Sequence, residues 1–156
     1  MQCVIIKNKE ITNYSNIFQL LKSGVESLFV IDYDAIYKKH LNFNLYEKLS
    51  KFFELTIMNY PETTGDLMDT IINGATNVII NDNLTYRRIE EFISFTPNIA
   101  MNYNYNDSCI YFSENGGEMF LTGKQILLPY KTAFNYNSFN IPNEIKLEGF
   151  PPDLER

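Results

Sequence analysis

Cysteine and histidine are scarce in this chain of 156 residues, which contains only Cys3, Cys109 and His40. Two distant cysteines cannot build a disulfide framework, so the chain fits a reducing compartment and we expect a cytoplasmic protein. Two cysteines and one histidine at scattered positions also lack the ligand spacing of a zinc site. We therefore expect no bound metal and no cofactor.

Basic residues are also few, with 13 Lys and Arg against 19 Asp and Glu, a net charge of −6. That balance argues against a nucleic-acid partner. No apolar run approaches the roughly 18 residues of a membrane span, so we expect no membrane association. The length allows one hydrophobic core and predicts a single domain over 1–156, but it is too short for a (β/α)₈ barrel, which rarely has fewer than about 200 residues.

Short apolar runs alternate with amphipathic segments through the first hundred residues. The expected strands are Cys3–Ile6, Leu28–Ile31, Leu55–Met58, Val78–Ile80 and Ile99–Met101. Helices are expected over 13–23 and 44–53, from Thr63 or Thr64 to Gly74, and from Asn83 or Thr85 to Pro97. Asparagine and threonine favour the first turn of a helix, and glycine and proline favour its end. The alternation predicts a parallel sheet with right-handed crossovers.

The pattern changes near residue 102. Two apolar runs, 109–112 and 119–121, flank Asn115-Gly116-Gly117 and predict a β-hairpin. Residues 126–128 follow as one more strand, and the chain from Tyr130 onward is rich in Asn, Tyr and Pro. The expected organisation is β/α repeats over 1–106, a hairpin and strand addition over 107–129, and an irregular tail over 130–156.

The expected fold is a parallel (β/α) half-barrel, or truncated TIM-type barrel, of four to five units with a C-terminal hairpin. A flavodoxin-like open sheet is the alternative, and strand order distinguishes the two. A half-barrel leaves sheet edges and an apolar inner face that the C-terminal hairpin, the tail or a second subunit has to cover. We therefore expect a homo-oligomer.

Two stretches resemble the histidine-biosynthesis barrel family, the phosphoribosylformimino-aminoimidazole carboxamide ribotide isomerase and its sister cyclase. Gly24–Ala35 is similar to that family's second strand and its Asp-x-Asp-Gly/Ala turn. Leu67–Ile80 is similar to its third helix, Gly-Ala turn and fourth strand. The resemblance covers 14–106, roughly 60% of the chain, and implies a barrel-type fold.

The family's functional motifs are missing. Its Gly-Gly-Ile-Arg phosphate turn after strand three is replaced by 59–62, where Pro61 lacks an N–H and Glu62 would repel a phosphate. Its Gly-Thr after strand four is replaced by Asn81-Asp82, and Asn104 stands near the expected catalytic Asp of strand five. An amide cannot exchange protons as a carboxylate does. Asn59, Asn81 and Asn104 are therefore our candidate ligand-binding residues.

Asp32 and Asp34 follow a strand at the end where α/β sites gather, and they are the candidate catalytic residues. Two close carboxylates can raise one pKa for acid–base work or chelate a cation. The alternative is a structural turn, in which each carboxylate accepts hydrogen bonds from loop N–H groups and caps the next element. The sequence favours this structural interpretation.

Other polar groups have plain structural interpretations. We expect His40 to be a solvated loop residue and Arg87-Arg88 to lie on an exposed helix face. The Asn/Tyr alternation over 102–106 and 135–137 suits a binding surface, but an A/T-rich genome would also produce it.

The sequence thus predicts a divergent relative of the isomerase family, without its activity, that acts as a binding or interaction protein. The alternative is a small isomerase or lyase acting on a phosphosugar-like metabolite at the strand ends, around Asp32, Asp34 and Asn59. Either function would involve a small-molecule ligand or a second copy of the chain.

Overall fold

A computed structural model describes residues 1–122, 126–129 and 145–154. The strands are β1 (Gln2–Lys7), β2 (Glu10–Ile11), β3 (Ser27–Asp32), β4 (Glu54–Met58), β5 (Ala75–Ile80), β6 (Ile99–Asn102), β7 (Met119–Leu121), β8 (Ile126–Pro129) and β9 (Ile145–Lys146). The helices are α1 (Phe18–Lys22), α2 (Tyr33–Lys38), α3 (Phe43–Ser50), α4 (Thr64–Ile72), α5 (Tyr86–Phe95) and α6 (Asp107–Glu114). The α/β class is as expected.

The strands form one sheet in the order β2-β1-β3-β4-β5-β6-β7-β8-β9. Every neighbouring pair from β1/β3 to β6/β7 is parallel, and β2, β8 and β9 pair antiparallel at the ends. The parallel strands β1, β3, β4, β5, β6 and β7 therefore follow chain order, whereas a flavodoxin-like sheet has its first parallel strand between two other parallel strands. The topology is that of the half-barrel, with five β/α units followed by β7.

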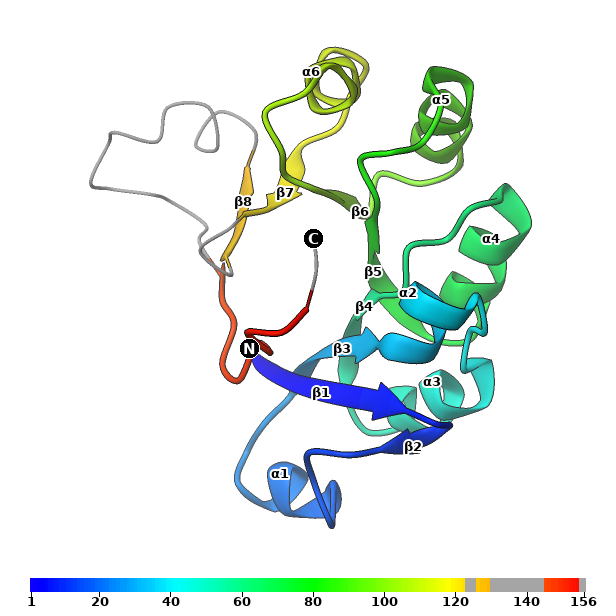
Figure 1. The fold of residues 1–156 in the computed structure, drawn as a ribbon. Helices are drawn as coiled ribbons and strands as arrows, with labels where there is room; N and C mark the ends of the chain where they lie inside the picture. The colour runs from blue at the N-terminus through cyan, green and yellow to red at the C-terminus, as the bar shows by residue number, and fades with distance from the viewer. Residues whose placement is uncertain (123–125, 130–144, 155–156) are drawn as a thin grey trace.

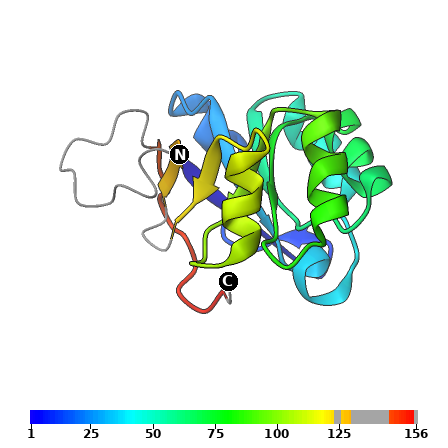
Figure 2. The same cartoon turned by 90° about the horizontal axis from the view of Figure 1, so that it is seen from above.

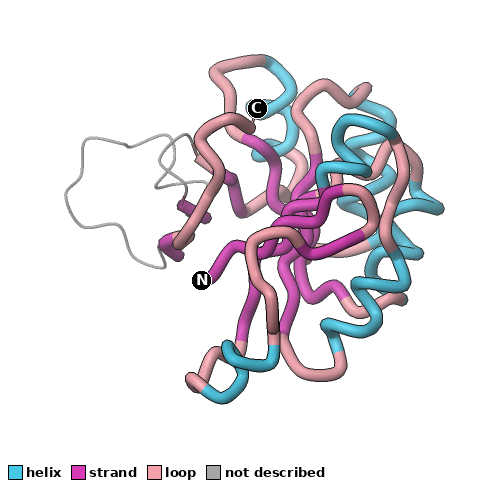
Figure 3. Tube along the Cα trace, turned by 60° about the horizontal axis from the view of Figure 1, so that its bottom comes forward, coloured by secondary structure: helices cyan, strands magenta, loops and turns pink. Residues whose placement is uncertain are grey.

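The sheet curves, with α3 to α6 on its outer side and residues 147–154 on its inner side (Figure 1). Seen from above, α4 and α5 again lie on the opposite side of the sheet from the segment 145–154 (Figure 2). The strands gather at the centre and the helices lie at the periphery (Figure 3). A single parallel bridge between Gln2 and Glu148 joins the two ends of the curve without a continuous ladder.

The continuous apolar strands serve two cores, one on each face. In β3, Leu28 and Val30 face the helices, while Phe29 and Ile31 face the inner side. Because successive side chains in a strand point to opposite faces, a strand covered on both faces has to be apolar throughout. The inner core includes Leu147, Phe150 and Leu154, so the tail, one of the three expected covers, packs on this face.

The C-terminal hairpin expected around Asn115-Gly116-Gly117 is wrong, because 109–112 lies in α6. Asn106 caps that helix by accepting a hydrogen bond from the Cys109 N–H at 3.0 Å. Gly116 has a φ of +110°, and a Cβ at Gly117 would lie 2.3 Å from the Phe112 ring. The glycines therefore end a helix, and the antiparallel pair is β7 with β8.

The first helix is shorter than expected, beginning at Phe18 rather than Asn13. The Asn13 side chain accepts a hydrogen bond from the Ile5 N–H at 2.9 Å and donates one to the Cys3 carbonyl at 2.8 Å. It extends the pairing of β1 instead of capping a helix. Most of the irregular tail, with the Asn/Tyr run 135–137, lies outside the described residues. Within the described part, none of the helices is long and apolar enough to span a bilayer.

Candidate functional site

The five candidate residues all lie at the carboxyl edge of the sheet. Asp32 ends β3, Asp34 lies in the first turn of α2, and Asn59 follows β4. Asn81 follows β5, and Asn104 follows β6. Because parallel strands end at the same edge, the fold brings these side chains to one end of the molecule.

Asp32 is fully buried and accepts four hydrogen bonds. Its Oδ1 accepts from the Ala35 N–H at 3.2 Å, which caps α2, and from the Asn42 Nδ2 at 2.8 Å. Its Oδ2 accepts from the Asn42 N–H at 3.0 Å and from the Tyr46 hydroxyl. Both oxygens are engaged by the chain itself, so this carboxylate has no free face for a substrate.

Asp34 has the same kind of role at the β1–β2 turn. It is 4% exposed and accepts from the Asn8 N–H at 2.9 Å, the Lys9 N–H at 2.8 Å and the Asn42 Nδ2 at 3.0 Å. Burial alone would raise the pKa of this carboxyl, but those hydrogen bonds and the Lys38 charge outweigh it and hold the pKa below its ordinary value. A carboxylate stabilised in its charged form is a poor general acid at neutral pH.

Asn42 and Tyr46 connect these acids to Asn59. The Tyr46 hydroxyl donates to Asp32 and accepts from the Asn59 Nδ2 at 3.3 Å, and Asn59 also donates to the Thr70 Oγ1 at 2.9 Å. Burial, followed by the Asp32 charge, raises the pKa of Tyr46 well above its ordinary range, so it stays a donor. We call Asp34, Asn42, Asp32, Tyr46, Asn59 and Thr70 the acid network.

Sequence reasoning did not identify Asn42, Tyr46 or Thr70 as members of this network. Asn42 precedes α3, where an asparagine ordinarily caps the helix, yet its side chain bonds the two aspartates instead. Tyr46 lies on the buried face of α3 beside Leu49, where an apolar residue would serve equally well for packing. The one available signal was a polar atom on an otherwise apolar helix face.

Asn59 is fully buried, and its Oδ1 has no hydrogen-bond partner among the described residues. An unsatisfied buried acceptor is uncommon and often marks a functional site or an unseen water. Here the amide lies beneath Tyr46 and Thr70, where a substrate cannot reach it. The structure therefore places Asn59 inside the fold and not in an open site.

Asn81 and Asn104 belong to a second group around Asp82, which the sequence analysis did not select. The Asp82 carboxylate accepts from the Nδ2 atoms of Asn102 at 3.4 Å, Asn104 at 2.9 Å and Asn106 at 2.5 Å. Asn81 accepts the Asp82 N–H at 2.8 Å. These hydrogen bonds connect the loop after β5 to the end of β6 and the loop that follows it.

The cleft between the two groups is small. It is lined by Tyr60, Glu62, Asn81 and Asn83, among others, and its volume is about 40 Å³. That is room for a few waters, whereas pockets for small-molecule ligands typically have about 300 Å³ or more. A sugar phosphate does not fit into this cleft beside Asn81.

The inner face of the curved sheet is covered by the chain's own segment 147–154. Leu147, Phe150 and Leu154 are buried there. The Tyr33 hydroxyl donates to Asp153 at 3.2 Å, and Lys7 lies 4.5 Å from the centre of the Tyr33 ring. Burial and the Asp153 charge raise the pKa of Tyr33 to about 12.

The remaining polar candidates follow their structural interpretations. His40 is exposed after α2, and the Arg88 Nη1 pairs with Glu91 at 2.9 Å on the surface of α5. Burial raises the pKa of the Cys3 thiol to about 12 and that of Cys109 to about 11. In the described residues no group of three or more His, Cys, Asp or Glu side chains is placed to hold a metal ion.

The fold and these side chains define a half-barrel α/β protein with a polar, internally bonded carboxyl edge. No protein-family model matches the chain, and no curated protein matches it either.

Proposed function

We propose that this protein is a divergent relative of the histidine-biosynthesis isomerases, without their activity, that acts in the cytoplasm as a binding or interaction protein. The observation that supports the proposal is that groups of the chain itself occupy the carboxylates of Asp32 and Asp34. Together their carboxylates accept seven hydrogen bonds from within the chain. General acid–base catalysis requires a carboxyl within hydrogen-bond reach of a substrate proton, and these two are already satisfied.

The alternative function, a small isomerase or lyase, is less well supported. It requires an accessible group at the strand ends, yet Asp32, Asp34 and Asn59 are 0%, 4% and 0% exposed. The interior on the other face of the sheet is filled by Phe150 and Leu154. A substrate would have to displace part of the core on either face.

A turnover assay tests the proposal. The full chain is incubated with the phosphoribosylformimino-aminoimidazole carboxamide ribotide, with an active family isomerase as positive control. We expect no aminoaldose isomerisation above background. Turnover by the wild type that is lost in both Asp32→Asn and Asp34→Asn would contradict the proposal and favour the enzyme.

We further propose a homo-oligomer. Since the C-terminal segment covers the inner face of the sheet, this proposal rests on exposed aromatic residues instead. Phe18 and Phe52 are 48% and 46% exposed, and their rings meet edge to face at 5.2 Å on the outer surface. Exposed aromatic pairs are enriched at subunit contacts. Light scattering after size exclusion should give a mass above 18.2 kDa, and Phe52→Glu should return it to the monomer. A monomeric wild type would contradict this proposal alone.

A further inference from the structure

Two short basic stretches meet at the carboxyl end of β1. Lys7-Asn8-Lys9 and Lys38-Lys39-His40 each contain two lysines and no acid, in a chain whose net charge is −6. The Lys38 ammonium donates to the Asn8 Oδ1 at 3.0 Å, which joins the two stretches directly. Between them lies a cleft of about 270 Å³ lined by Asn8, Lys9, Asp34, Lys38 and His40, which we call the basic cleft.

Two lysines of the basic cleft are available to pair with an anionic ligand. Lys39 is taken by an ion pair with Glu62, but Lys9 and Lys38 make no ion pair within 4.0 Å among the described residues. Both side chains are exposed. Lysine ammonium groups bind phosphate oxygens as point charges.

Asp34 would oppose an anion, but its charge is already compensated. The carboxylate is 4% exposed and its oxygens accept the Asn8 and Lys9 N–H groups and the Asn42 amide. Lys9 and Lys38 against Asp34 leave the cleft with a net positive charge. Asp34 thus holds the turn between β1 and β2 in place.

The backbone around the basic cleft is held in shape. Asn8, Lys9 and Lys39 have φ values of 51°, 65° and 60°, in the left-handed region. Asn8 and Lys9 form the two-residue turn between β1 and β2, and Lys39 ends α2 where glycine is usual. The acid network anchors both loops through Asp34 and Asn42. A rigid support lowers the entropy cost of ligand binding.

We infer that the basic cleft binds a phosphate monoester of a small metabolite, an inference that rests on the proposed binding function. Its volume of about 270 Å³ lies just below the typical range of about 300 to 1,000 Å³ for drug-sized ligands, which suits a ligand of the size of a sugar phosphate. The site lies after β1 and α2, and Lys39 of its second stretch pairs with Glu62 in the loop after β4.

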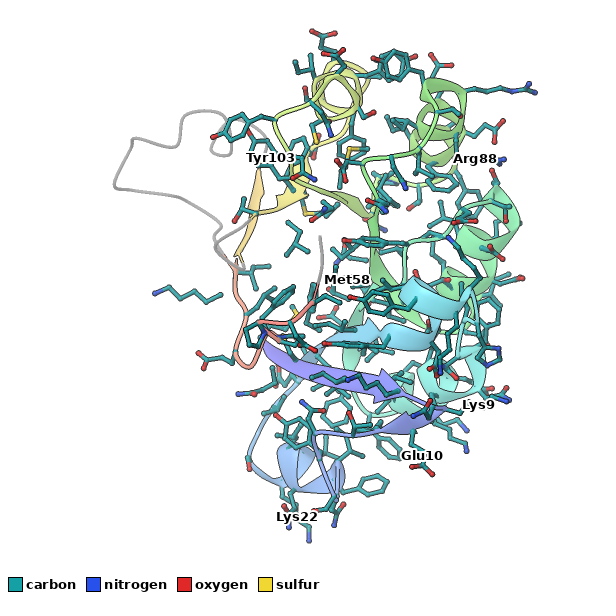
Figure 4. All side chains as sticks on the ribbon, viewed as in Figure 1. Lys9, Glu10, Lys22, Met58, Arg88 and Tyr103 are labelled. Atoms are coloured by element: carbon teal, nitrogen blue, oxygen red, sulfur yellow. The ribbon has the colours of Figure 1, made fainter. Side chains whose placement is uncertain are left out.

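The test is a calorimetric titration of the full chain with inorganic phosphate, ribose 5-phosphate and ribose. We expect saturable binding of at least one of the two phosphates and none of ribose. Lys9→Gln and Lys38→Gln keep a polar side chain and remove one charge, so each should weaken binding about tenfold. Lys22→Gln is the matched control, because Lys22 is an exposed lysine at the end of α1, away from Lys9 (Figure 4).

Several results would overturn the inference. These are binding of neither phosphate, equal binding of ribose, or phosphate binding that neither Lys9→Gln nor Lys38→Gln weakens. Circular dichroism confirms that each variant is folded. Failure of the titration would leave the proposed non-catalytic function standing, whereas turnover in the isomerase assay would contradict that function and leave the titration result unchanged.

Discussion

Replacing Asp32 with alanine should destabilise the protein strongly if the acid network is structural. The change removes the acceptor for the Ala35 N–H, the Asn42 N–H and the Tyr46 hydroxyl, all in buried residues. The Asn42 amide retains its bond to Asp34 at 3.0 Å. A buried donor left without a partner costs about 1 to 3 kcal/mol. Three such donors, with some relaxation, predict a loss of about 3 to 5 kcal/mol.

The assay is thermal and urea unfolding of wild type, Asp32→Ala, Asp34→Ala and a surface control. For a chain of this size, about 3 to 5 kcal/mol corresponds to a midpoint roughly 10 °C lower. Asp34→Ala should cost less, about 1 to 2 kcal/mol, because Asn8 and Lys9 are exposed and water can replace the carboxylate. Asp69→Ala on exposed α4 should change stability by less than about 0.5 kcal/mol.

The sign of the Asp32→Ala effect separates the two interpretations of this acid. Acids retained for catalysis commonly strain the folded state, so their removal tends to stabilise a protein. An unchanged or higher unfolding midpoint in Asp32→Ala would therefore refute the structural interpretation. It would also remove the main support for a non-catalytic function.

Three further predictions concern pH, a turn and the C-terminal segment. The folded pKa of Asp34 lies below its ordinary value, so the stability that its charge contributes is complete above about pH 4 and is lost as the pH falls through the folded pKa. The free energy of unfolding of Asp34→Asn should therefore fall less than that of the wild type as the pH is lowered over this range. Gly74→Ala would place a Cβ 2.2 Å from the Ser50 Cβ, whereas Gly24 has open space at a similar φ, so urea unfolding should show Gly74→Ala losing more than Gly24→Ala, and equal losses would argue against the contact. Phe150→Ala should cost about 3 to 4 kcal/mol in thermal unfolding, and a loss below about 1 kcal/mol would show that the segment does not cover the inner core.

Local signals predicted the individual elements well. Thr63 and Thr85 each accept a hydrogen bond from the N–H three residues on, as the capping pattern requires. Gly74 follows the end of α4 with a φ of +111°, which favours glycine, and a Cβ there would lie 2.2 Å from the Ser50 Cβ. Asn-Gly-Gly was misread because the same residues suit a hairpin turn and a helix end, and only the Asn106 cap at the other end of the helix separates the two.

Long-range contacts could not be predicted from single residues. Asp32 and Asp34 were identified as a candidate pair with a structural alternative, but the partners that decide between the roles, Asn42 and Tyr46, come from another helix. The coverage of the inner face by Phe150 depends on where the C-terminal segment returns to the sheet. The spacing of polar and apolar residues predicts whether a residue is buried in its own helix or strand. It does not predict which residue of another element it contacts.

The strand order has a consequence for how stability is distributed along the chain. From β1 to β7 each parallel strand pairs with the next one in sequence, so each can join a neighbour that has already formed as the chain is synthesised. In such a linear arrangement the β7–β8 end would fray independently of β1. The Gln2–Glu148 bridge and the burial of Leu147 join the first strand to the last segment. Amide hydrogen exchange should therefore show β1 and residues 147–150 losing protection together, as one cooperative unit.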